Sequence, residues 1–538
     1  MVDAMTMRAD LEYRSIPRMA LESARRFGDA PAVIDGDIVL SFNDVADVMQ
    51  RVAASLIASG IEPRDRVALW APNSSAWITT ALGIMAAGAW LVPINTRFRG
   101  AEAADIINRA EVRTLFVTSD FLGTDYLSML NAEASTPSSL TDVVKIPTPY
   151  EGDDADWRDF ISRGRDVSQE QVHERLSMIG SEDISDIIFT SGTTGTPKGV
   201  MLRHGASLRC YESYNTGFCL GEGDRHLIAT PFFHCFGYKA GWMLSLLVGA
   251  VTIPLPVFDA RAAIEIIERH RVTHMPGAPT MYFAMLDEPE RVEHDISSLK
   301  TAIIGAATIP EELVRRMLIE LEIEHLMTGY GLTENHALGF FTRPDDLPSK
   351  ILTTVGQLAP GLEARLVDQD GHEVGAGTPG EVEFAGYARM AGYYNDAVAT
   401  DQAFDGDWLR TGDVGVLDAE GYLTITDRKK DIFVMGGFNV APAEVEKVLV
   451  RLGGVSQVAV VAMPDDRFGE VGAAFVIPRP DTQLIEQDVI DFARLHLANY
   501  KVPRKVVIVE ELPVNATGKV LKSELRRRLA EETKLRGG

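Results

Sequence analysis

The stretch Thr190-Ser-Gly-Thr-Thr-Gly-Thr-Pro-Lys-Gly199 constrains what this chain can be more than any other part of the sequence. It follows Ile187-Ile-Phe189, an apolar run that predicts a buried strand. The glycines let backbone N–H groups approach an anion, the hydroxyls can donate hydrogen bonds, and Lys198 adds a positive charge. The spacing differs from that of the Walker P-loop, because Pro197 precedes the lysine and Gly199 follows it. We therefore predict a loop that binds a polyphosphate, with an ordinary surface turn as the alternative.

The length and the charge of the chain exclude several classes of protein. A chain of 538 residues exceeds what one hydrophobic core usually supports, so at least two domains are expected, and 46% hydrophobic residues are ample to fill them. The 77 acidic residues against 52 basic ones give a net charge of −25, which argues against a nucleic-acid surface. Any site for an anion must then be a locally built positive pocket.

The cysteines and the chain ends indicate a cytoplasmic protein. The 3 cysteines have neither the spacing of a zinc site nor that of a disulfide framework, so we expect buried thiols in a reducing compartment. The first residues mix charges with apolar side chains and the last residues carry no targeting signal, so we expect no signal peptide and no lipid anchor. Glycine and proline interrupt the uncharged stretch 241–258, which favours a helix, a turn and a strand over a membrane span.

Apolar runs typical of strands alternate with helical patterns over much of the chain, which predicts an α/β fold built in layers. The expected strands include 67–70, 114–117, 187–189, 227–229, 251–253 and 301–304, and the expected helices include 260–271 and 311–321. Beyond about Gly356, short runs separated by glycine and aspartate turns predict a β-rich subdomain.

The charged run Asp427-Arg-Lys-Lys-Asp431 lies between two apolar strands and is the domain boundary that we predict, although such a run is often only a solvated turn. The large N-terminal domain would comprise residues 1–428, with the α/β layers and the β-rich subdomain. Residues 429–538 would form a small, mobile α+β domain that is large enough to fold on its own.

Five further segments join the phosphate loop in an order that resembles one enzyme superfamily. They are Pro231-Phe-Phe-His, Gly305-Ala-Ala, Gly329-Tyr-Gly-Leu-Thr-Glu, Trp408-Leu-Arg-Thr-Gly-Asp and Pro513-Val-Asn-Ala-Thr-Gly-Lys. Together with residues 427–446 they resemble the acyl-adenylate-forming ligases, which include acyl-CoA synthetases, peptide-synthetase adenylation domains and firefly luciferase. The resemblance spans about residues 41–522. It implies that ATP, Mg²⁺ and coenzyme A are used to convert a carboxylic acid first into an acyl-AMP and then into a thioester.

The resemblance assigns the phosphates of ATP to the first loop. The residues concerned are Thr190, Ser191, Gly192, Thr193, Thr194, Gly195, Thr196 and Lys198. Glu334 is the one carboxylate of its loop, and a carboxylate beside a triphosphate makes sense when a hard cation such as Mg²⁺ lies between them. Thr333 can donate to a phosphate oxygen. Tyr330 offers a flat face to adenine, although an aromatic flanked by glycines is often a core residue.

Three residues nearer the C-terminus match the family's ribose and catalytic positions. Asp413 matches the aspartate that accepts both ribose hydroxyls, since a carboxylate has lone pairs for two donors. Arg428 would reach the ribose or the α-phosphate. Lys519 matches the lysine that bridges the attacking carboxylate and the α-phosphate, where an ammonium stabilises the charge that both groups share.

The thioester step requires a second arrangement, which the family reaches by rotating its C-terminal domain about a hinge that matches Lys430. Rotation would withdraw Lys519. It would bring up Gly436 and Gly437, which leave room for the pantetheine arm of CoA. His234 resembles the residue that gates the passage between the pantetheine tunnel and the acyl pocket.

The resemblance places the acyl pocket among the residues after His234 and around two glycine-containing loops. The candidates are Phe236, Gly237, Tyr238, Lys239, Gly305, Ala306, Ala307 and Gly329. Small residues let a flat or ring-bearing acid lie close to the backbone. Residues 236–239 include no carboxylate for a substrate ammonium, which disfavours activation of an amino acid. Lys239 could donate to a second carbonyl of the acid, and a structural ion pair is the alternative.

At a finer level, residues 231–241, 274–280, 425–431 and 436–440 resemble the bacterial steroid-catabolic CoA ligases, which activate the propanoate side chain of a hexahydroindanedione. A ligase for a medium-chain fatty acid or an aryl acid and a non-catalytic acyl or nucleotide sensor are the alternatives. A carrier-protein pantetheine also stays open as the acceptor. The expected partners are the acid, ATP and CoA, and the sequence leaves a homodimer open.

Overall fold

The computed structural model describes residues 8–118, 120–133, 139–147, 155–190, 197–305, 309, 311–428, 431–435, 438–465, 468–480, 482–515 and 519–536. The chain divides into two compact units. Unit 1 comprises residues 1–363 and 384–409, and unit 2 comprises residues 364–383 and 410–538. The boundary that the sequence suggested after residue 428 lies within unit 2 and stays a prediction.

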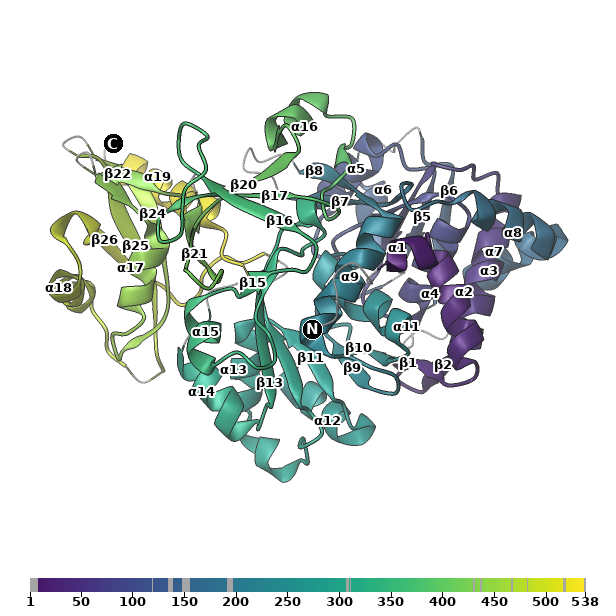
Figure 1. The fold of residues 1–538 in the computed structure, drawn as a ribbon, viewed down its shortest axis with the longest axis horizontal. Helices are drawn as coiled ribbons and strands as arrows, with labels where there is room; N and C mark the ends of the chain where they lie inside the picture. The colour runs from purple at the N-terminus through teal and green to yellow at the C-terminus, as the bar shows by residue number, and fades with distance from the viewer. Residues whose placement is uncertain are drawn as a thin grey trace. The chain divides into compact units, whose positions relative to one another are not determined.

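Two twisted sheets form the framework of unit 1 (Figure 1). The first contains, in spatial order, β15 (Gln357–Leu358), β14 (Phe340–Phe341), β13 (His325–Tyr330), β12 (Thr301–Ile304), β11 (His274–Gly277), β9 (Arg225–Ile228), β10 (Val251–Pro254), β1 (Pro31–Asp35) and β2 (Ile38–Ser41). The second contains β18 (Gly392–Tyr393), β8 (Lys198–Arg203), β7 (Ile184–Thr190), β4 (Trp90–Pro93), β3 (Arg66–Trp70), β5 (Thr114–Val117) and β6 (Asp142–Lys145). The central strands of both sheets are parallel, and antiparallel strands lie at the edges.

Helices fill the space between the two sheets and also cover their outer faces (Figure 1). The inner layer contains α2 (Ile16–Phe27), α3 (Phe42–Ala58), α4 (Ser75–Ala86), α9 (His204–Phe218) and α11 (Leu244–Val248). The outer layers are α5 (Gly100–Arg109) and α6 (Tyr126–Asn131) on the seven-stranded sheet, and α12 (Ala260–His270), α13 (Pro279–Asp287) and α14 (Glu311–Glu320) on the nine-stranded sheet. The remaining helices of unit 1 are short or peripheral: α1 (Ala9–Glu12), α7 (Ala155–Arg163), α8 (Gln169–Met178), α10 (Cys235–Gly237), α15 (Pro348–Thr353) and α16 (Ala397–Ala403).

Continuous apolar runs form these strands because both faces of each sheet are buried. In β3, Val67 and Leu69 face the inner core whereas Ala68 and Trp70 face the outer helices. Side chains alternate between the two faces of a strand, so a sheet covered on both sides needs apolar residues at every position. This explains why the sequence showed runs and not an alternating pattern.

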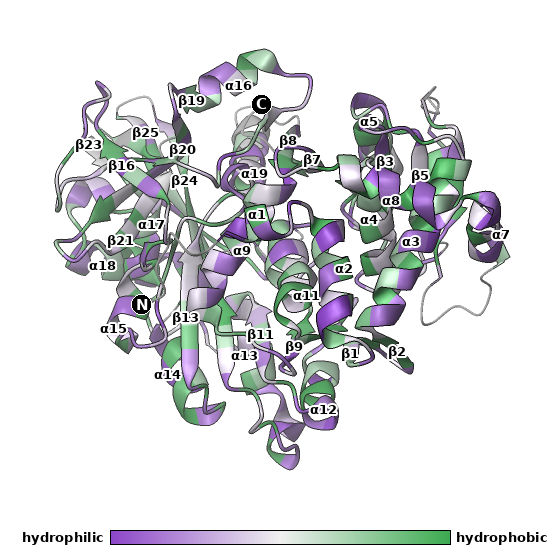
Figure 2. Cartoon of the chain, turned by 45° about the vertical axis from the view of Figure 1, so that its right-hand side comes forward, coloured by the Kyte–Doolittle hydropathy of each residue, from purple (hydrophilic) through white to green (hydrophobic). Residues whose placement is uncertain are grey.

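The helices are amphipathic and begin at residues that cap them. The hydroxyl of Ser41 accepts from the backbone N–H of Asp44 at the start of α3, and the carboxylate of Asp44 accepts in return from the N–H of Ser41. Figure 2 shows apolar and polar residues alternating along α2 and α3. The apolar positions of α2, among them Ile16 and Met19, are fully buried in the inner core.

Two further sheets belong mainly to unit 2. One contains β16 (Glu363–Val367), β17 (Gly380–Ala385), β20 (Trp408–Leu417) and β19 (Phe404–Asp405), with β21 (Leu423–Arg428) paired to β20. The other contains β23 (Phe438–Val440), β22 (Phe433–Met435), β25 (Gly469–Pro478) and β24 (Val455–Asp465), with β26 (Lys505–Ile508) paired to β25. Helices α17 (Pro442–Leu449) and α18 (Glu486–His496) cover one face of this second sheet, and α19 (Lys522–Arg536) covers the other.

The fold class expected from the sequence is confirmed: layered α/β structure, then a β-rich part, then a small α+β part. The uncharged stretch 241–258 forms α11, a left-handed turn at Gly249 and β10, as expected. Among the described residues, no helix combines the length and the apolar character that crossing a bilayer requires.

Candidate active site

The phosphate-binding loop suggested by the sequence is closed at its base by a hairpin. Strands β7 and β8 are antiparallel, and Thr190 pairs with Lys198 as their last rung. The predicted phosphate ligands Ser191, Gly192, Thr193, Thr194, Gly195 and Thr196 lie outside the described residues. Lys198 starts β8, and its ammonium lies 4.9 Å from the centre of the Tyr393 ring.

A tight, strained turn presents Glu334. Strand β13 ends at Tyr330, and a Cβ on the next residue, Gly331, would lie 2.3 Å from the carbonyl carbon of Ala337, so only glycine fits there. His336 and Ala337 both have a φ of 59°, in the left-handed region that residues with side chains rarely adopt. Hydrogen bonds hold this conformation: the N–H of Ala337 donates to the carbonyl of Leu332, and the N–H of Leu332 donates to the side-chain oxygen of Asn335. Strain retained in this way is common at functional sites.

The carboxylate of Glu334 is bound by a residue that the sequence did not single out. The hydroxyl of Tyr393 donates to Glu334 Oε1 at 2.9 Å, so this tyrosine contacts both Lys198 and Glu334. Thr333 is 6% exposed beside Glu334. The centre of the Tyr330 ring lies 6.1 Å from that of the buried Phe384 ring, at an angle of 30°. The stacking of adenine on Tyr330 stays a prediction.

Tyr393 thus holds one oxygen of Glu334, while no group among the described residues donates to the other oxygen. A carboxylate in this state suits Mg²⁺. This ion usually takes one or two carboxylates together with substrate phosphates. Among the described residues, the ligand-bearing side chains that cluster as a group of three, Asp368, Asp370 and His372, lie exposed in a turn after β16. The oxygen Asp368 Oδ1 of that turn already accepts backbone N–H bonds, which is what such turns usually show.

His234 is held as a neutral imidazole at the start of a short helix. Its Nδ1 accepts from the N–H of Phe236 at 3.2 Å, so Nε2 carries the proton. Burial lowers the pKa of His234 to about 4. The loop before it is braced by Asn73, another residue that the sequence did not reveal: its amide donates to the carbonyl of Thr230 at 2.9 Å and accepts from the N–H of Phe232 at 2.8 Å.

Two of the predicted acyl-pocket segments meet. A Cβ on Gly305, after β12, would lie 3.7 Å from the ring of Phe236, so the ring rests over this glycine. A Cβ on Gly237 would lie 2.3 Å from the carbonyl oxygens of Thr230 and Pro231, so glycine is required there. Gly329 lies in β13 opposite Phe341. Ala306 and Ala307 lie outside the described residues.

Lys239 has the ion pair that the sequence left open as an alternative to a substrate contact. Its ammonium lies 2.8 Å from Asp186 Oδ2 and 2.6 Å from the Ser207 hydroxyl, and both charged side chains are 0% exposed. Tyr238 is also fully buried, packed against Trp77 and stacked at 4.9 Å on Trp242. A substrate could reach either residue only if this packing opened, so both are interior residues of this conformation. A single sequence gave no signal for Asp186, which lies 53 positions from its partner.

The remaining predicted residues lie in unit 2. Asp413 is 3% exposed on β20 and pairs with Arg428 of β21 across the strand ladder, so the two predicted ribose residues lie opposite each other. Lys519 is exposed on a short turn in which its N–H donates to Asn515 Oδ1 and its carbonyl accepts from the N–H of Asn515, both at 2.8 Å. The predicted residues Lys430, Gly436 and Gly437 lie outside the described residues, as does the side chain of Arg428.

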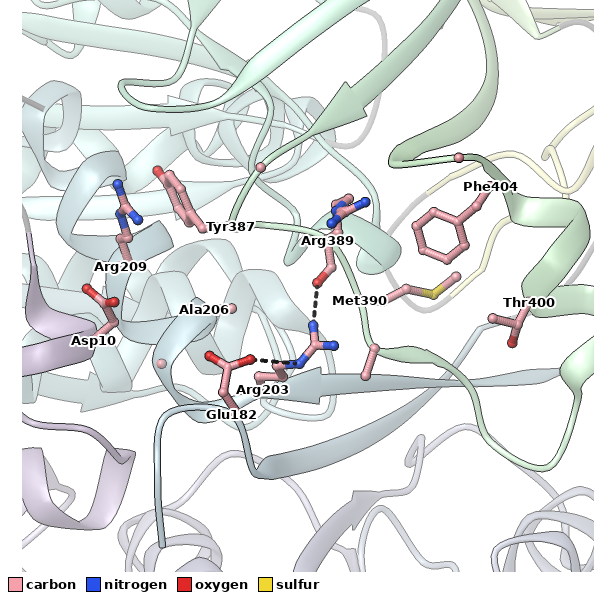
Figure 3. A pocket seen from close by; sticks show the side chains of 14 residues that line it. Asp10, Glu182, Arg203, Ala206, Arg209, Tyr387, Arg389, Met390, Thr400 and Phe404 are labelled. Atoms are coloured by element: carbon pink, nitrogen blue, oxygen red, sulfur yellow. Dashed lines mark hydrogen bonds and ion pairs between the residues drawn. The ribbon is translucent and has the colours of Figure 1, made fainter. Parts of the chain in front are cut away.

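A polar pocket of about 490 Å³ opens in unit 1 at the Arg203 end of β8 (Figure 3). It is separate from the Lys198 end of that strand, which is five residues and roughly 17 Å away. Its arginines are largely engaged by protein groups: Arg203 lies 3.5 Å from Glu182, Arg389 pairs with Asp407 at 2.9 Å, and Arg209 stacks on Tyr387 at 4.1 Å. These paired arginines make it a poor phosphate site, although one residue of its wall, Met390, also bonds the backbone of Glu334.

Comparisons with known proteins agree with the geometry. Residues 21–394 match the family model described as AMP-binding enzyme, and residues 444–519 match the AMP-binding enzyme C-terminal domain. The chain is 45% identical to a Mycobacterium tuberculosis protein and 43% identical to a Rhodococcus jostii protein, both named 3-(7a-methyl-1,5-dioxo-octahydro-1H-inden-4-yl)propanoyl:CoA ligase. The alignments cover 96% and 95% of this chain and 99% and 98% of those proteins. A crystal structure of an anthranilate CoA ligase with anthranoyl-AMP matches with a TM-score of 0.84 at 26% identity, covering 96% of this chain and 97% of that one.

Proposed function

The chain belongs to the AMP-binding enzymes, and from this premise we propose the reaction and the residues that carry it. The protein is an AMP-forming acyl-CoA synthetase that uses ATP, Mg²⁺ and CoA. In the first step a carboxylate oxygen attacks the α-phosphorus of ATP, which forms an acyl-AMP and releases pyrophosphate. In the second step the CoA thiol attacks the acyl carbonyl and AMP leaves, so the thioester forms without a protein nucleophile.

We propose a ring-bearing propanoate, derived from a steroid indanedione, as the acid. The support is the name of the two relatives, each aligned along nearly its whole length. The ring of Phe236 over Gly305 gives a flat apolar surface beside bare backbone, which suits a fused ring system. Because Lys239 is enclosed and paired, recognition of the ring carbonyls is assigned to groups other than its ammonium. We further propose that the protein acts in the cytoplasm.

The observation that carries the first step is that Lys198 and Glu334 meet at one tyrosine. Lys198 at the base of the phosphate loop would offset charge on the β- and γ-phosphates, and Thr190 and Thr333 would donate to phosphate oxygens. The second carboxylate oxygen of Glu334 would hold Mg²⁺, which when bound offsets the charge on the phosphates.

We assign the alternation between the two steps to the predicted mobile C-terminal domain, residues 429–538. Lys519 would bridge the attacking carboxylate and the α-phosphate in the first step and withdraw in the second, about a hinge at Lys430. Asp413 would accept the ribose hydroxyls, with Arg428 beside it. The exposed position of Lys519 near the C-terminus supports this assignment. The neutral imidazole of His234 would gate the pantetheine passage without adding charge to it.

One experiment tests the reaction and the acid together. The enzyme, ATP and Mg²⁺ are mixed with each acid of a panel without CoA, and pyrophosphate release and acyl-AMP are measured; CoA is then added and the thioester is quantified. The panel contains the indanedione propanoate, octanoate and benzoate. We expect the indanedione acid to give the highest kcat/KM. Silence with every acid would favour a sensor over an enzyme, and a preference for octanoate would overturn the proposed substrate.

A further inference from the structure

Tyr393 occupies a position between the two charged groups on which the proposed first step depends. Its hydroxyl lies 2.9 Å from Glu334 Oε1, and the ammonium of Lys198 lies 4.9 Å from the centre of its ring. Lys198 starts β8 of the seven-stranded sheet, whereas Glu334 follows β13 of the nine-stranded sheet. One side chain therefore joins a cation from one sheet to a carboxylate from the other.

The backbone fixes where this ring lies. Strand β18 runs antiparallel to β8 with Tyr393 opposite Val200, so its side chain lies on the same face of the sheet as those of Val200 and Lys198. A residue diagonal to an aromatic across a ladder lies within its reach, which explains the contact with Lys198. The N–H of Tyr393 donates to the Thr400 hydroxyl at 2.9 Å, and the N–H of Tyr394 donates to the carbonyl of Gly199 at 2.7 Å.

The same segment also holds the backbone of Glu334. The N–H of Met390 donates to the carbonyl of Glu334 at 2.7 Å. Glu334 is therefore bonded twice to residues 390–393, once through its main chain and once through its carboxylate. Two attachments leave the carboxylate little freedom to rotate, so one oxygen faces Tyr393 and the other is presented elsewhere.

A tyrosine is chemically suited to this task. Its hydroxyl donates to a carboxylate without neutralising it, whereas an arginine or lysine at that position would compete with a metal ion for the negative charge. Burial, together with the neighbouring carboxylate of Glu334, raises the pKa of Tyr393 above its usual range, so the hydroxyl is a hydrogen-bond donor at neutral pH.

We propose that Tyr393 is a positioning residue for adenylation: its hydroxyl holds Glu334 so that a single carboxylate oxygen is offered to the divalent cation, and its ring holds the Lys198 ammonium beside it. This inference rests on the proposed function, in which Glu334 binds the cation and Lys198 binds phosphate. It predicts that removing one oxygen atom from residue 393 weakens cation binding without affecting the thioester step.

The neighbouring residue provides a matched control. Tyr394 follows Tyr393 in the chain, and its hydroxyl lies 3.4 Å from Glu111, a carboxylate that has no part in the proposed site. Tyr393→Phe and Tyr394→Phe each remove one hydroxyl that faces a glutamate. A general effect of losing such a bond on the fold would appear in both variants.

The test measures cation binding directly as well as activity. Wild type, Tyr393→Phe and Tyr394→Phe are titrated with Mn²⁺ in the presence of α,β-methylene-ATP, and free Mn²⁺ is followed by its electron paramagnetic resonance signal. The loss of a hydrogen bond to a charged group leads us to expect about five- to tenfold weaker Mn²⁺ binding in Tyr393→Phe. We expect a matching rise in the Mg²⁺ concentration needed for pyrophosphate exchange. Thioester formation from supplied acyl-AMP, and the midpoint of thermal unfolding, should match those of wild type.

A second substitution separates the two roles of the side chain. Tyr393→Leu removes the ring as well, so it should also weaken binding of the nucleotide analogue in the absence of metal, whereas Tyr393→Phe should not. Should Tyr393→Leu fail to fold, the result with Tyr393→Phe still decides the case. Unchanged Mn²⁺ affinity in Tyr393→Phe, or an equal loss in Tyr394→Phe, would overturn the inference. If wild type releases no pyrophosphate with any acid, the proposed function fails. The Mn²⁺ affinities of wild type and Tyr393→Phe still show separately whether Tyr393 supports cation binding.

Discussion

Two lysines of this chain lie in opposite surroundings, Lys239 inside unit 1 and Lys519 on the surface of unit 2. Lys239 has no exposed surface and is held by Asp186 and Ser207. Lys519 is exposed on a turn closed by two hydrogen bonds with Asn515. A cation enclosed with its partner can meet a substrate only if the packing around it opens, whereas an exposed side chain can be reached from the solvent. The comparison shows that burial, more than residue type, determines whether a lysine side chain can contact a substrate.

The largest effect should come from breaking the enclosed pair. Asp186→Ala leaves the Lys239 ammonium with Ser207 alone, and Lys239→Met leaves a buried carboxylate, so each variant should lower the free energy of unfolding by about 3–5 kcal/mol. Urea denaturation followed by circular dichroism measures this. Lys239→Met should also leave the ratio of KM values for an oxo-acid and a plain fatty acid unchanged.

Two controls sharpen the test of the enclosed pair. The double variant Asp186→Leu/Lys239→Met should be less damaging than either single change, because it leaves no unpaired buried charge. Glu22→Gln breaks an ion pair with Arg25 at the surface and should have no measurable effect. Single variants as stable as wild type would show that Lys239 does not depend on Asp186.

The exposed lysine should matter for one step only. Lys519→Ala should lower the rate of adenylation by about 10²- to 10³-fold, the usual loss when one group that stabilises transition-state charge is removed. Thioester formation from supplied acyl-AMP and the thermal stability should be spared. Pyrophosphate release and thioester formation are measured separately, with Lys447→Ala as an exposed lysine control in the same unit. Equal damage to both steps would contradict the role assigned to Lys519.

Acid should destabilise the surroundings of the enclosed lysine. Burial and the charge of Lys239 lower the pKa values of His204 and His336 to about 3, against about 6.5 in an unfolded chain. Between these values the unfolded chain binds more protons, so the stability that the two histidines contribute is fully present above pH 6.5 and is lost as the pH falls. At pH 5 the loss is on the order of 2 kcal/mol for each histidine.

Urea midpoints at pH 7.5, 6 and 5 measure this loss. The fall should be shallower in His204→Gln, whereas His173→Gln changes an exposed histidine and should leave the slope as it is. A wild-type midpoint that stays constant down to pH 5 would speak against neutral buried histidines.

The smallest effect concerns backbone packing near the same lysine. Gly237→Ala would place a methyl group 2.3 Å from two carbonyl oxygens and should cost about 1–3 kcal/mol, because the turn before Lys239 must shift. In unit 2, Gly375 has open space around the position of a Cβ and no left-handed φ, so Gly375→Ala should be neutral or slightly stabilising. Thermal unfolding compares the two. Similar midpoints would mean that the turn at Gly237 adapts.

The sequence predicted the parts of the fold that depend on local pattern. Strands at 114–117 and 301–304 form β5 and β12 with the expected bounds, and the helix expected at 260–271 is α12, which ends at His270. Long apolar runs and helical periodicity are properties of neighbouring residues, so one sequence suffices to find them. The π-helical turn at Tyr238–Met243 left no such pattern.

The site was predictable where a motif carries the chemistry and not where distant residues meet. Lys198 and Glu334 stood out because each is a charge in a glycine-containing loop. Tyr393 did not, since Ala391-Gly-Tyr-Tyr-Asn395 reads as a turn and its partner lies 59 positions away. Asn73 was missed for the same reason: the loop that it braces lies more than 150 residues along the chain. The burial of Lys239 and its ion pair with Asp186 could not be predicted from the sequence, because burial depends on the whole fold.

The origin of the site residues in two different sheets has a consequence for how such an enzyme can diversify. Thr190, Lys198 and Tyr393 come from the seven-stranded sheet, whereas Gly305 and Tyr330 come from the nine-stranded sheet or directly follow one of its strands. Substitutions around Gly305 can reshape the acyl pocket for a new acid, while Tyr330, assigned to adenine, and Lys198, assigned to phosphate, stay unchanged. The hydrogen bond between Tyr393 and Glu334 connects residues from the two sheets. Enzymes that evolve toward a new acid are therefore expected to keep this hydrogen bond.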